Sequence, residues 1–261
     1  MIIALNFLRL VGKCFSPILK LLRLLGFYKD KNHDPRAAWA RKYLAYKFLK
    51  GDGLEIGALH KPLAVSPGVT VKYVDRLSAK DLRNQYPELK DLKIINPDIV
   101  ENGETLASVE NESQDFIIAN HFIEHCENPV GTLLNHLSKL RPSGILFYAL
   151  PHRDNTFDAN RPLTSVDHLL QDYKDNGVSS RENHFKEFAK LTKGLDSKEA
   201  ELEAKKLMNQ NYSIHFHVWT PDSFKVFLDA INSEFKPCFE IVESLVWKYA
   251  KSEFLVVLRK I

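Results

Sequence analysis

The repeated alternation of short apolar runs with amphipathic helical segments constrains the fold of this 261-residue chain most strongly. The pattern is clearest where Asn128-Pro129 supplies an N-cap and a first-turn proline, and Val130, Leu133 and Leu137 follow at helical spacing. The predicted strands are residues 53–57, 69–74, 97–100, 115–119, 145–150, 239–249 and 253–258. Strand, helix and strand in repetition predict a Rossmann-like α/β fold, a mostly parallel seven-stranded sheet with helices on both faces. The last two strands should form a hairpin at one edge of that sheet.

The segment from residue 151 to about residue 211 differs from the rest because charged and polar residues dominate it. Helices are predicted near residues 165–175, 181–193 and 197–209, and we interpret the segment as a helical insertion after the fifth strand. Further helices are expected over residues 34–50 and 79–86, and from Thr220-Pro221-Asp222 onward. The chain is thus divided into a basic amphipathic arm, residues 1–33, and one domain, residues 34–261.

The positive charge of the chain is concentrated at its start. Residues 1–31 hold six basic residues and one acidic residue, whereas the formal net charge of the whole chain is +3. The body is therefore nearly neutral, and we predict no nucleic-acid-binding surface. Basic residues interrupt the apolar runs of the arm, which excludes a transmembrane helix of about 20 apolar residues. Residues 17–27 read as an amphipathic helix that packs on the domain or a partner, or else lies on a membrane surface.

Three widely separated cysteines, Cys14, Cys126 and Cys238, form no disulfide framework and favour a reducing, cytoplasmic setting. Peripheral contact with the inner face of the membrane through the arm is the alternative location. The oligomeric state has no signature in the sequence.

Ligands of open α/β sheets bind beyond the carboxyl ends of the strands, which draws attention to Glu55 and Gly57 at the end of the first strand. A dinucleotide site would need further glycines after Gly57, but Ala58 and His60 occupy those positions. S-adenosyl-L-methionine has no phosphate to cradle, and its cationic groups suit a carboxylate such as Glu55. An ordinary tight turn is the alternative interpretation.

Two more acidic residues stand where the second and third strands are expected to end. Asp75 follows Glu55 by about 20 positions, a spacing at which a carboxylate commonly accepts hydrogen bonds from ribose hydroxyls. The alternative is an aspartate paired with Arg76. Asp98 is expected to end the third strand, where it can accept from an adenine amino group while the backbone amide of Ile99 donates to the ring. A surface acid is nearly as good an interpretation of Asp98.

At this point the sequence resembles the class I S-adenosylmethionine-dependent methyltransferases. The resemblance rests on four segments, residues 54–57, 73–75, 115–125 and 128–146. A narrower resemblance, to a bacterial subgroup of methyltransferases thought to act on cell-surface sugars or related small molecules, rests on residues 55–63, 151–163 and 215–220. The resemblance to the methyltransferase family implies that the cofactor is held by nine residues. They are Glu55, Gly57 and Ala58 at the methionine end, Asp75 and Arg76 at the ribose, Asp98 and Ile99 at the adenine, and Asn120 and His121 on the path to the substrate.

The loop after the fifth strand should face the methyl group. His152 is our first candidate for the general base and Asp154 the second, with a loop that only shapes the pocket as the alternative. Arg153 and Asp158 are predicted to contact a small-molecule substrate. His215 and His217 lie one residue apart, so in a strand both would point to one face. There they would contact the substrate or pack the insertion against the sheet.

A metal site is the other reading of these histidines, which could act with His121, His125, His152, His168 or His184. No tight ligand spacing supports it, and we predict no metal. Methyl transfer to an oxygen or nitrogen of a small polar, sugar-like acceptor is therefore the expected activity. A cofactor-binding or membrane- or partner-binding protein without catalysis is the alternative, and a metal-dependent hydrolase is the third reading.

Overall fold

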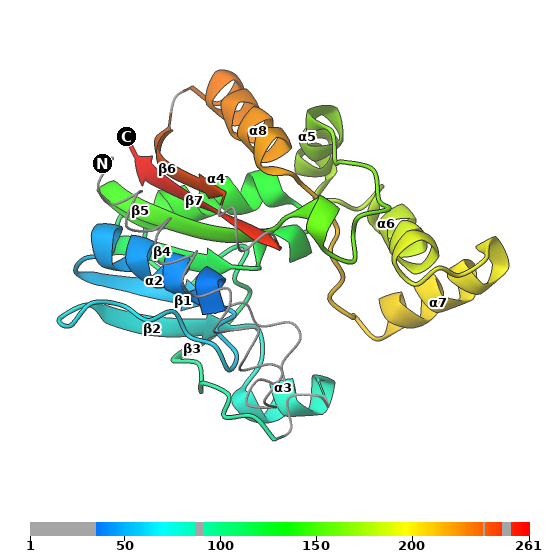
Figure 1. The fold of residues 1–261 in the computed structure, drawn as a ribbon, viewed down its shortest axis with the longest axis horizontal. Coiled ribbons are helices and arrows are strands. Elements are labelled where there is room, and N and C mark those ends of the chain that lie inside the picture. Colours follow the sequence, from blue (N-terminus) through cyan, green and yellow to red (C-terminus); the bar gives the residue numbers. More distant parts are fainter. Residues whose placement is uncertain (1–34, 87–90, 237, 247–251) are drawn as a thin grey trace, which may run out of the picture.

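The computed structural model describes residues 35–86, 91–236, 238–246 and 252–261, which form a seven-stranded sheet flanked by helices (Figure 1). The basic arm predicted for residues 1–33, with its amphipathic helix and Cys14, lies outside the described residues. Cys126 and Cys238 are free thiols. Within the described ranges, no helix has the length and apolar character needed to cross a membrane.

The sheet has the strand order β3-β2-β1-β4-β5-β7-β6. Its strands are β1 (Asp52–Ile56), β2 (Thr70–Asp75), β3 (Ile99–Val100), β4 (Gln114–Asn120), β5 (Leu140–Pro151), β6 (Phe239–Val246) and β7 (Glu253–Lys260). The first five strands pair in parallel, while β7 runs antiparallel between β5 and β6. The order 3-2-1-4-5 is that of a doubly wound fold, to which β6 and β7 add the predicted hairpin at one edge.

Period-two alternation along the central strands builds a separate core on each face of the sheet. In β4, Ile117 and Ala119 pack with helices α4 (Pro129–Lys139) and α8 (Pro221–Glu234), whereas Phe116 and Ile118 pack with α2 (Pro35–Phe48). Strands covered on both faces read as continuous apolar runs, which is why the sequence revealed β4 and β5 so clearly. Figure 1 shows α2 on one face and α4 and α8 on the other.

Side-chain caps begin the helices at the predicted positions. The Asn128 side chain accepts from the Gly131 backbone amide at 2.8 Å, ahead of Pro129 in the first turn of α4. Thr220 caps α8 in the same way, with Ser223 completing a capping box. The other predicted helix before the insertion is α3 (Ala79–Gln85). The start of β5 differs from the prediction. Helix α4 ends at Lys139 and β5 begins at Leu140, so the Pro142-Ser143-Gly144 turn lies inside β5, where the pairing with β4 is irregular and Ser143 has a φ of 66°.

The insertion contains α5 (Val166–Asp175), α6 (Arg181–Glu187) continued by a π-helical turn (Phe188–Thr192), and α7 (Ser197–Asn209). All three helices match predicted segments. Figure 1 shows α6 and α7 projecting away from the sheet. Phe185, Leu207, Ile214 and Phe216 share a small core there, so the chain beyond residue 211 still packs with the insertion.

Candidate functional site

Four candidate residues lie where parallel strands of the sheet end: Gly57, Asp75, Asn120 and His152 follow or end β1, β2, β4 and β5. We call this side of the sheet, where the parallel strands end, the carboxyl edge. Gly57 adopts a φ of 66°, a conformation that side-chain-bearing residues rarely adopt, and its amide donates to the Val74 carbonyl at 2.9 Å. A Cβ atom at Gly57 would meet no atom within 4 Å. The turn after β1 therefore opens onto free space at this edge, where a ligand can approach the backbone.

Glu55 lies beneath that turn and is 1% exposed. Both of its carboxylate oxygens accept from the Leu63 amide, at 2.9 and 3.0 Å, and so hold the loop that follows Gly57. Burial raises the pKa of Glu55 from 4.5 to about 7, against the Leu63 hydrogen bond and the charge of Arg41, which lower it. A cation placed beside Glu55 would favour its ionised form.

A chain of charged groups joins α2 to the segment after β4. Arg41 of α2 binds both oxygens of Glu253 at the start of β7, one of them through Nε at 2.9 Å. Glu253 Oε2 lies 2.9 Å from His121 Nε2, and His121 Nδ1 lies 3.4 Å from Glu124 Oε1. Burial alone would raise the pKa of Glu253, but its hydrogen bonds with His121 and Arg41 lower it to about 2.

His121 has the complementary shift. Burial would lower its pKa, but the hydrogen bonds to Glu124 and Glu253 outweigh burial and raise it to about 9, although 38% of its side chain is exposed. His121 is therefore an imidazolium at neutral pH, with a carboxylate on each ring nitrogen. In this state it cannot accept a proton, and it acts on the site through its charge.

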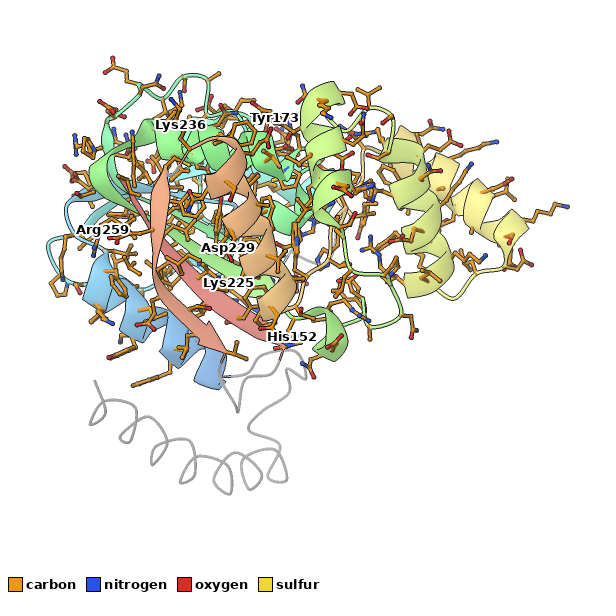
Figure 2. The ribbon with its side chains drawn as sticks, turned by 90° about the horizontal axis from the view of Figure 1, so that it is seen from above. His152, Tyr173, Lys225, Asp229, Lys236 and Arg259 are labelled. Atoms are coloured by element: carbon orange, nitrogen blue, oxygen red, sulfur yellow. The ribbon has the colours of Figure 1, made fainter. Side chains whose placement is uncertain are left out.

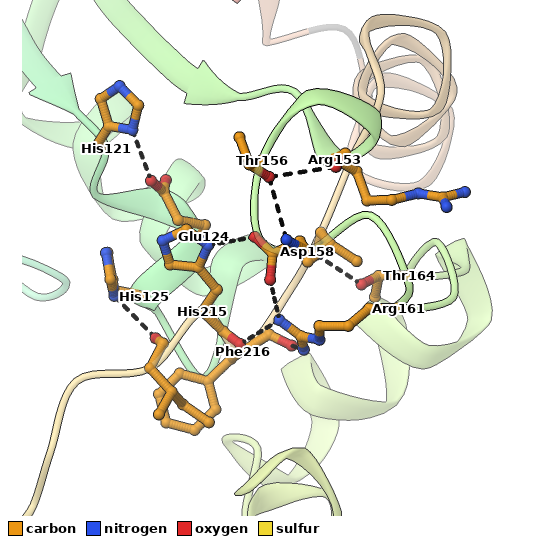
Figure 3. A network of polar contacts seen from close by, with 12 residues as sticks. His121, Glu124, His125, Arg153, Thr156, Asp158, Arg161, Thr164, His215 and Phe216 are labelled. Atoms are coloured by element: carbon orange, nitrogen blue, oxygen red, sulfur yellow. Dashed lines mark hydrogen bonds and ion pairs between the residues drawn. The ribbon is translucent and has the colours of Figure 1, made fainter. Parts of the chain in front are cut away.

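Glu124 is fully buried and is surrounded by imidazoles (Figure 3). Ligand atoms of Glu124, His125 and His215 all lie within 4.8 Å of one another. The Nδ1 atom of His125 lies 2.8 Å from the Ile214 carbonyl oxygen, and that of His215 lies 2.6 Å from Asp158 Oδ2. Burial would raise the pKa of Glu124, but His121 lowers it, so this carboxylate is balanced by the imidazolium beside it.

Asp158, predicted to bind substrate, lies in a buried ion pair instead of an open pocket. Its Oδ1 accepts from Arg161 at 3.0 Å and its Oδ2 pairs with His215, so both oxygens are used within the protein. Arg161 is 1% exposed and also donates to Glu187 and to the carbonyls of His215 and Phe216. Sequence reasoning missed Arg161, because one arginine in a polar loop carries no periodic signal.

His152 begins the loop after β5, next to the start of β7, because Pro151 pairs with Glu253 (Figure 2). Its Nδ1 is buried and has no hydrogen-bond partner among the residues described. Asp154 has a 53% exposed side chain that lies 3.1 Å from the Arg153 guanidinium, and Arg153 donates to the Ala159 carbonyl. Of the two predicted bases, His152 is therefore the less exposed, because it is half-buried where β5 ends.

Asn120 ends β4 at the same edge, and the structure gives its amide group no partner. Both its side-chain oxygen and its side-chain nitrogen are buried without a hydrogen bond to any residue in the described ranges. Buried amide groups are almost always bonded, so this pair of atoms is suited to a ligand.

Asp75 ends β2 and is half-buried, which raises its pKa. Arg76 donates to the Tyr86 hydroxyl at 2.9 Å.

Asp98 is a correction to the sequence analysis, because it precedes β3 instead of ending it. Its Oδ2 accepts from the Tyr73 amide at 2.8 Å and extends the β2–β3 ladder, while Ile99 lies in β3 itself. Glu101 is the carboxylate that follows β3, and it holds Ser108. A two-residue strand gives too little pattern for its end to be read from sequence.

The pair His215 and His217 is the second correction. The segment that carries them is irregular, not a strand, so the two rings do not share one face. His215 lies with Glu124 and His125, whereas His217 lies with His168, Asp172 and His184. Alternation along a strand was therefore the wrong premise for this pair.

A cavity of about 520 Å³ lies at the opposite edge of the sheet, among Asp52, Thr70, Gln114 and Arg141 at or near the amino ends of the strands. Neither Gly57 nor Asn120 lines it. We place the candidate site at the carboxyl edge, because that is where open α/β sheets hold their ligands and where the open turn and the unpartnered amide lie.

Comparison with known proteins yields no matching family model and no matching curated sequence. Among solved structures, a protein from Rhodobacter sphaeroides named as a Zn-dependent alcohol dehydrogenase is similar at 13% identity and a TM-score of 0.51, over 85% of this chain and 90% of that one. A SAM-dependent methyltransferase from Aquifex aeolicus gives 11% identity and 0.43, over 88% and 100%. Mitomycin 7-O-methyltransferase MmcR gives 13% and 0.45 over 86% of this chain, which spans 53% of its length. At 13% identity, the likeness to the Rhodobacter sphaeroides protein is one of fold alone.

Proposed function

We propose that this protein is an S-adenosyl-L-methionine-dependent methyltransferase that acts on an oxygen or nitrogen of a small polar, sugar-like acceptor. The observation that carries the proposal is the group at the carboxyl edge: an open glycine turn at Gly57, a carboxylate at Asp75 and a buried, unpartnered amide at Asn120. The five residues directly after Gly57, residues 58–62, include no second glycine with which to bind a pyrophosphate. A cofactor without phosphates fits such an edge.

In this proposal the chain holds the cofactor at several points. Gly57 and Ala58 leave room at the backbone, Asp75 accepts from the ribose hydroxyls, and Asn120 bonds the ligand with its free amide. Glu55, with a pKa of about 7, gives the edge a carboxylate that ionises fully when an organic cation lies near it. Bound there, the cofactor supplies an electrophilic methyl group.

The proton of the acceptor needs a base. His152 is half-buried at the carboxyl edge, directly after Pro151, which pairs with Glu253. We assign His152 to remove the proton from the acceptor hydroxyl or amine as the methyl carbon leaves sulfur and bonds to the acceptor. The same loop contains Arg153, Asp154 and Asp158, whose contacts fix its shape. Arg153 pairs with Asp154, and Asp158 holds the His215 ring in place through its Oδ2 atom. The imidazolium of His121 keeps the two carboxylates beside it charged.

Titration calorimetry with S-adenosyl-L-methionine and the full chain tests this proposal. We expect one site per chain, and an affinity reduced at least tenfold in Asp75→Asn. Asp115→Asn is the matched control, because this aspartate lies at the amino end of β4 and pairs with Arg141. Absence of heat at millimolar cofactor in a folded sample would refute cofactor binding. Binding without transfer to any of a panel of sugar-like acceptors would favour the non-catalytic alternative.

A further inference from the structure

Four potential metal ligands converge between the insertion and the segment before α8. His168 and Asp172 lie one turn apart on α5, His184 lies on α6, and His217 lies near the end of the irregular segment. One ligand atom from each, three imidazole nitrogens and one carboxylate oxygen, lie within 4.8 Å of one another. Three elements that are separate in sequence are thus joined at one point.

Four of the six separations among these atoms are close to those of a single tetrahedral centre. Asp172 Oδ2 lies 3.1 Å from His168 Nε2, 3.8 Å from His184 Nε2 and 3.5 Å from His217 Nε2, and the first two nitrogens are 3.0 Å apart. Ligand atoms held about 2.1 Å from one Zn²⁺ in a tetrahedron lie about 3.4 Å from one another. The four measured separations scatter around that value.

Several polar atoms of the cluster have no hydrogen-bond partner among the residues that the structure describes. His217 is 0% exposed, and neither of its ring nitrogens has a hydrogen-bond partner in the part of the chain that the structure describes. Ser180 Oγ donates to Asp172 Oδ1 at 2.6 Å, which fixes the carboxylate and leaves Oδ2 toward the three histidines. A cation that accepts one lone pair from each of the four side chains would give Asp172 Oδ2 and His217 Nε2 the partner that they lack.

We propose that His168, Asp172, His184 and His217 bind one Zn²⁺ ion in a closed, structural site. Imidazole nitrogen with one carboxylate suits this ion, and Asp172 and His217 are 0% exposed, so most of the coordination sphere is shielded from solvent. His168, with a 38% exposed side chain, faces the solvent through which the ion enters. The ion ties α5 and α6 to the segment that carries His215 against Glu124.

This site differs from the expectation of no metal, because its ligands have no tight spacing along the chain. His168 and Asp172 are an ordinary i, i+4 pair, and His184 follows His168 by 16 positions. The other group of three, Glu124, His125 and His215, has one ligand fewer, and its carboxylate is balanced by the His121 imidazolium. That group serves as the internal comparison.

Metal content of the full chain, purified without a metal-affinity column, tests the proposal. We expect one zinc per chain by elemental analysis, and loss of it in Asp172→Asn and in His168→Ala, whose side chain is the most exposed of the four. Ser180→Ala should bind Zn²⁺ about 10- to 100-fold more weakly in competition with a chromophoric chelator. Glu124→Gln is the matched control and should keep its zinc.

Cobalt substitution in the wild-type protein tests the same site without relying on a variant that could fold poorly. Wild-type protein stripped of metal and loaded with Co²⁺ should show the intense visible bands of a tetrahedral site, and Zn²⁺ should displace them. Metal-free folded protein that takes up neither ion would overturn the proposal. Zinc retained in Asp172→Asn but lost in Glu124→Gln would overturn it too, by moving the ion to the other group. None of these outcomes depends on methyl transfer.

Discussion

Replacement of Glu55 by glutamine should make the stability of the protein less sensitive to pH. The carboxyl group is 1% exposed and its pKa is raised from 4.5 to about 7 by burial. The folded state therefore binds this proton more tightly than the unfolded state does. Its stabilising effect is complete below pH 4.5 and is lost as the pH rises through 7. Glutamine keeps an oxygen for the Leu63 amide and carries no charge to bury.

The size of the effect follows from that shift in pKa. Between pH 5 and pH 8 the wild type should lose about 2.5 kcal/mol of unfolding free energy through Glu55 alone, and Glu55→Gln should not. Urea unfolding of both proteins without cofactor, at pH 5 and pH 8, measures the difference. Glu240→Gln, on the edge strand β6, is the control, because its side chain is 54% exposed. We therefore expect the unfolding free energy of Glu55→Gln minus that of the wild type to rise between pH 5 and pH 8. A value that stays flat or falls over this range would refute the reasoning.

Three other substitutions test the site. Glu253→Gln should destabilise the protein by about 3 kcal/mol at pH 7 and by less as pH falls from about 5 toward 2, because the pKa of Glu253 is lowered to about 2; urea unfolding across that range checks the sign. Arg161→Met should lower the unfolding free energy by about 3 kcal/mol, since it leaves Oδ1 of the buried Asp158 carboxylate without its cationic partner and His215 as the one remaining partner, and thermal unfolding reports it. His152→Gln should lower kcat about 100-fold or more with KM little changed, whereas Asp154→Asn stays within a few-fold; equal losses in steady-state assays would contradict the assignment of the base.

The sequence was sufficient for most of the architecture, because buried parallel strands and capped helices leave local signals. Asn128 and Thr220 mark helix starts through their own side-chain hydrogen bonds. The end of β3 was predicted wrongly for a physical reason. The strand is two residues long, and Asp98, which accepts a hydrogen bond from the Tyr73 amide, precedes it. A strand that short has no alternation to detect.

The polar networks were beyond sequence reasoning because their members meet only in the folded chain. Arg41 and Glu253 are 212 positions apart, and Arg161 reaches the carbonyl oxygens of a segment 54 and 55 positions away. The prediction that His215 and His217 share one face was wrong because their backbone is irregular. Two-residue periodicity holds in a strand and not in a loop. Glu55, Asp75 and Asn120 lie at or near the ends of regular strands, so their positions in the fold could be predicted from the local pattern.

A crystal structure with S-adenosylhomocysteine tests the central claim most directly. We expect the ligand at the carboxyl edge, with its backbone approach at Gly57, its ribose at Asp75, a hydrogen bond to the Asn120 amide, and His152 facing the empty methyl position. Density for the ligand in the 520 Å³ cavity among Asp52, Thr70 and Arg141, at the amino edge of the sheet, would contradict the account.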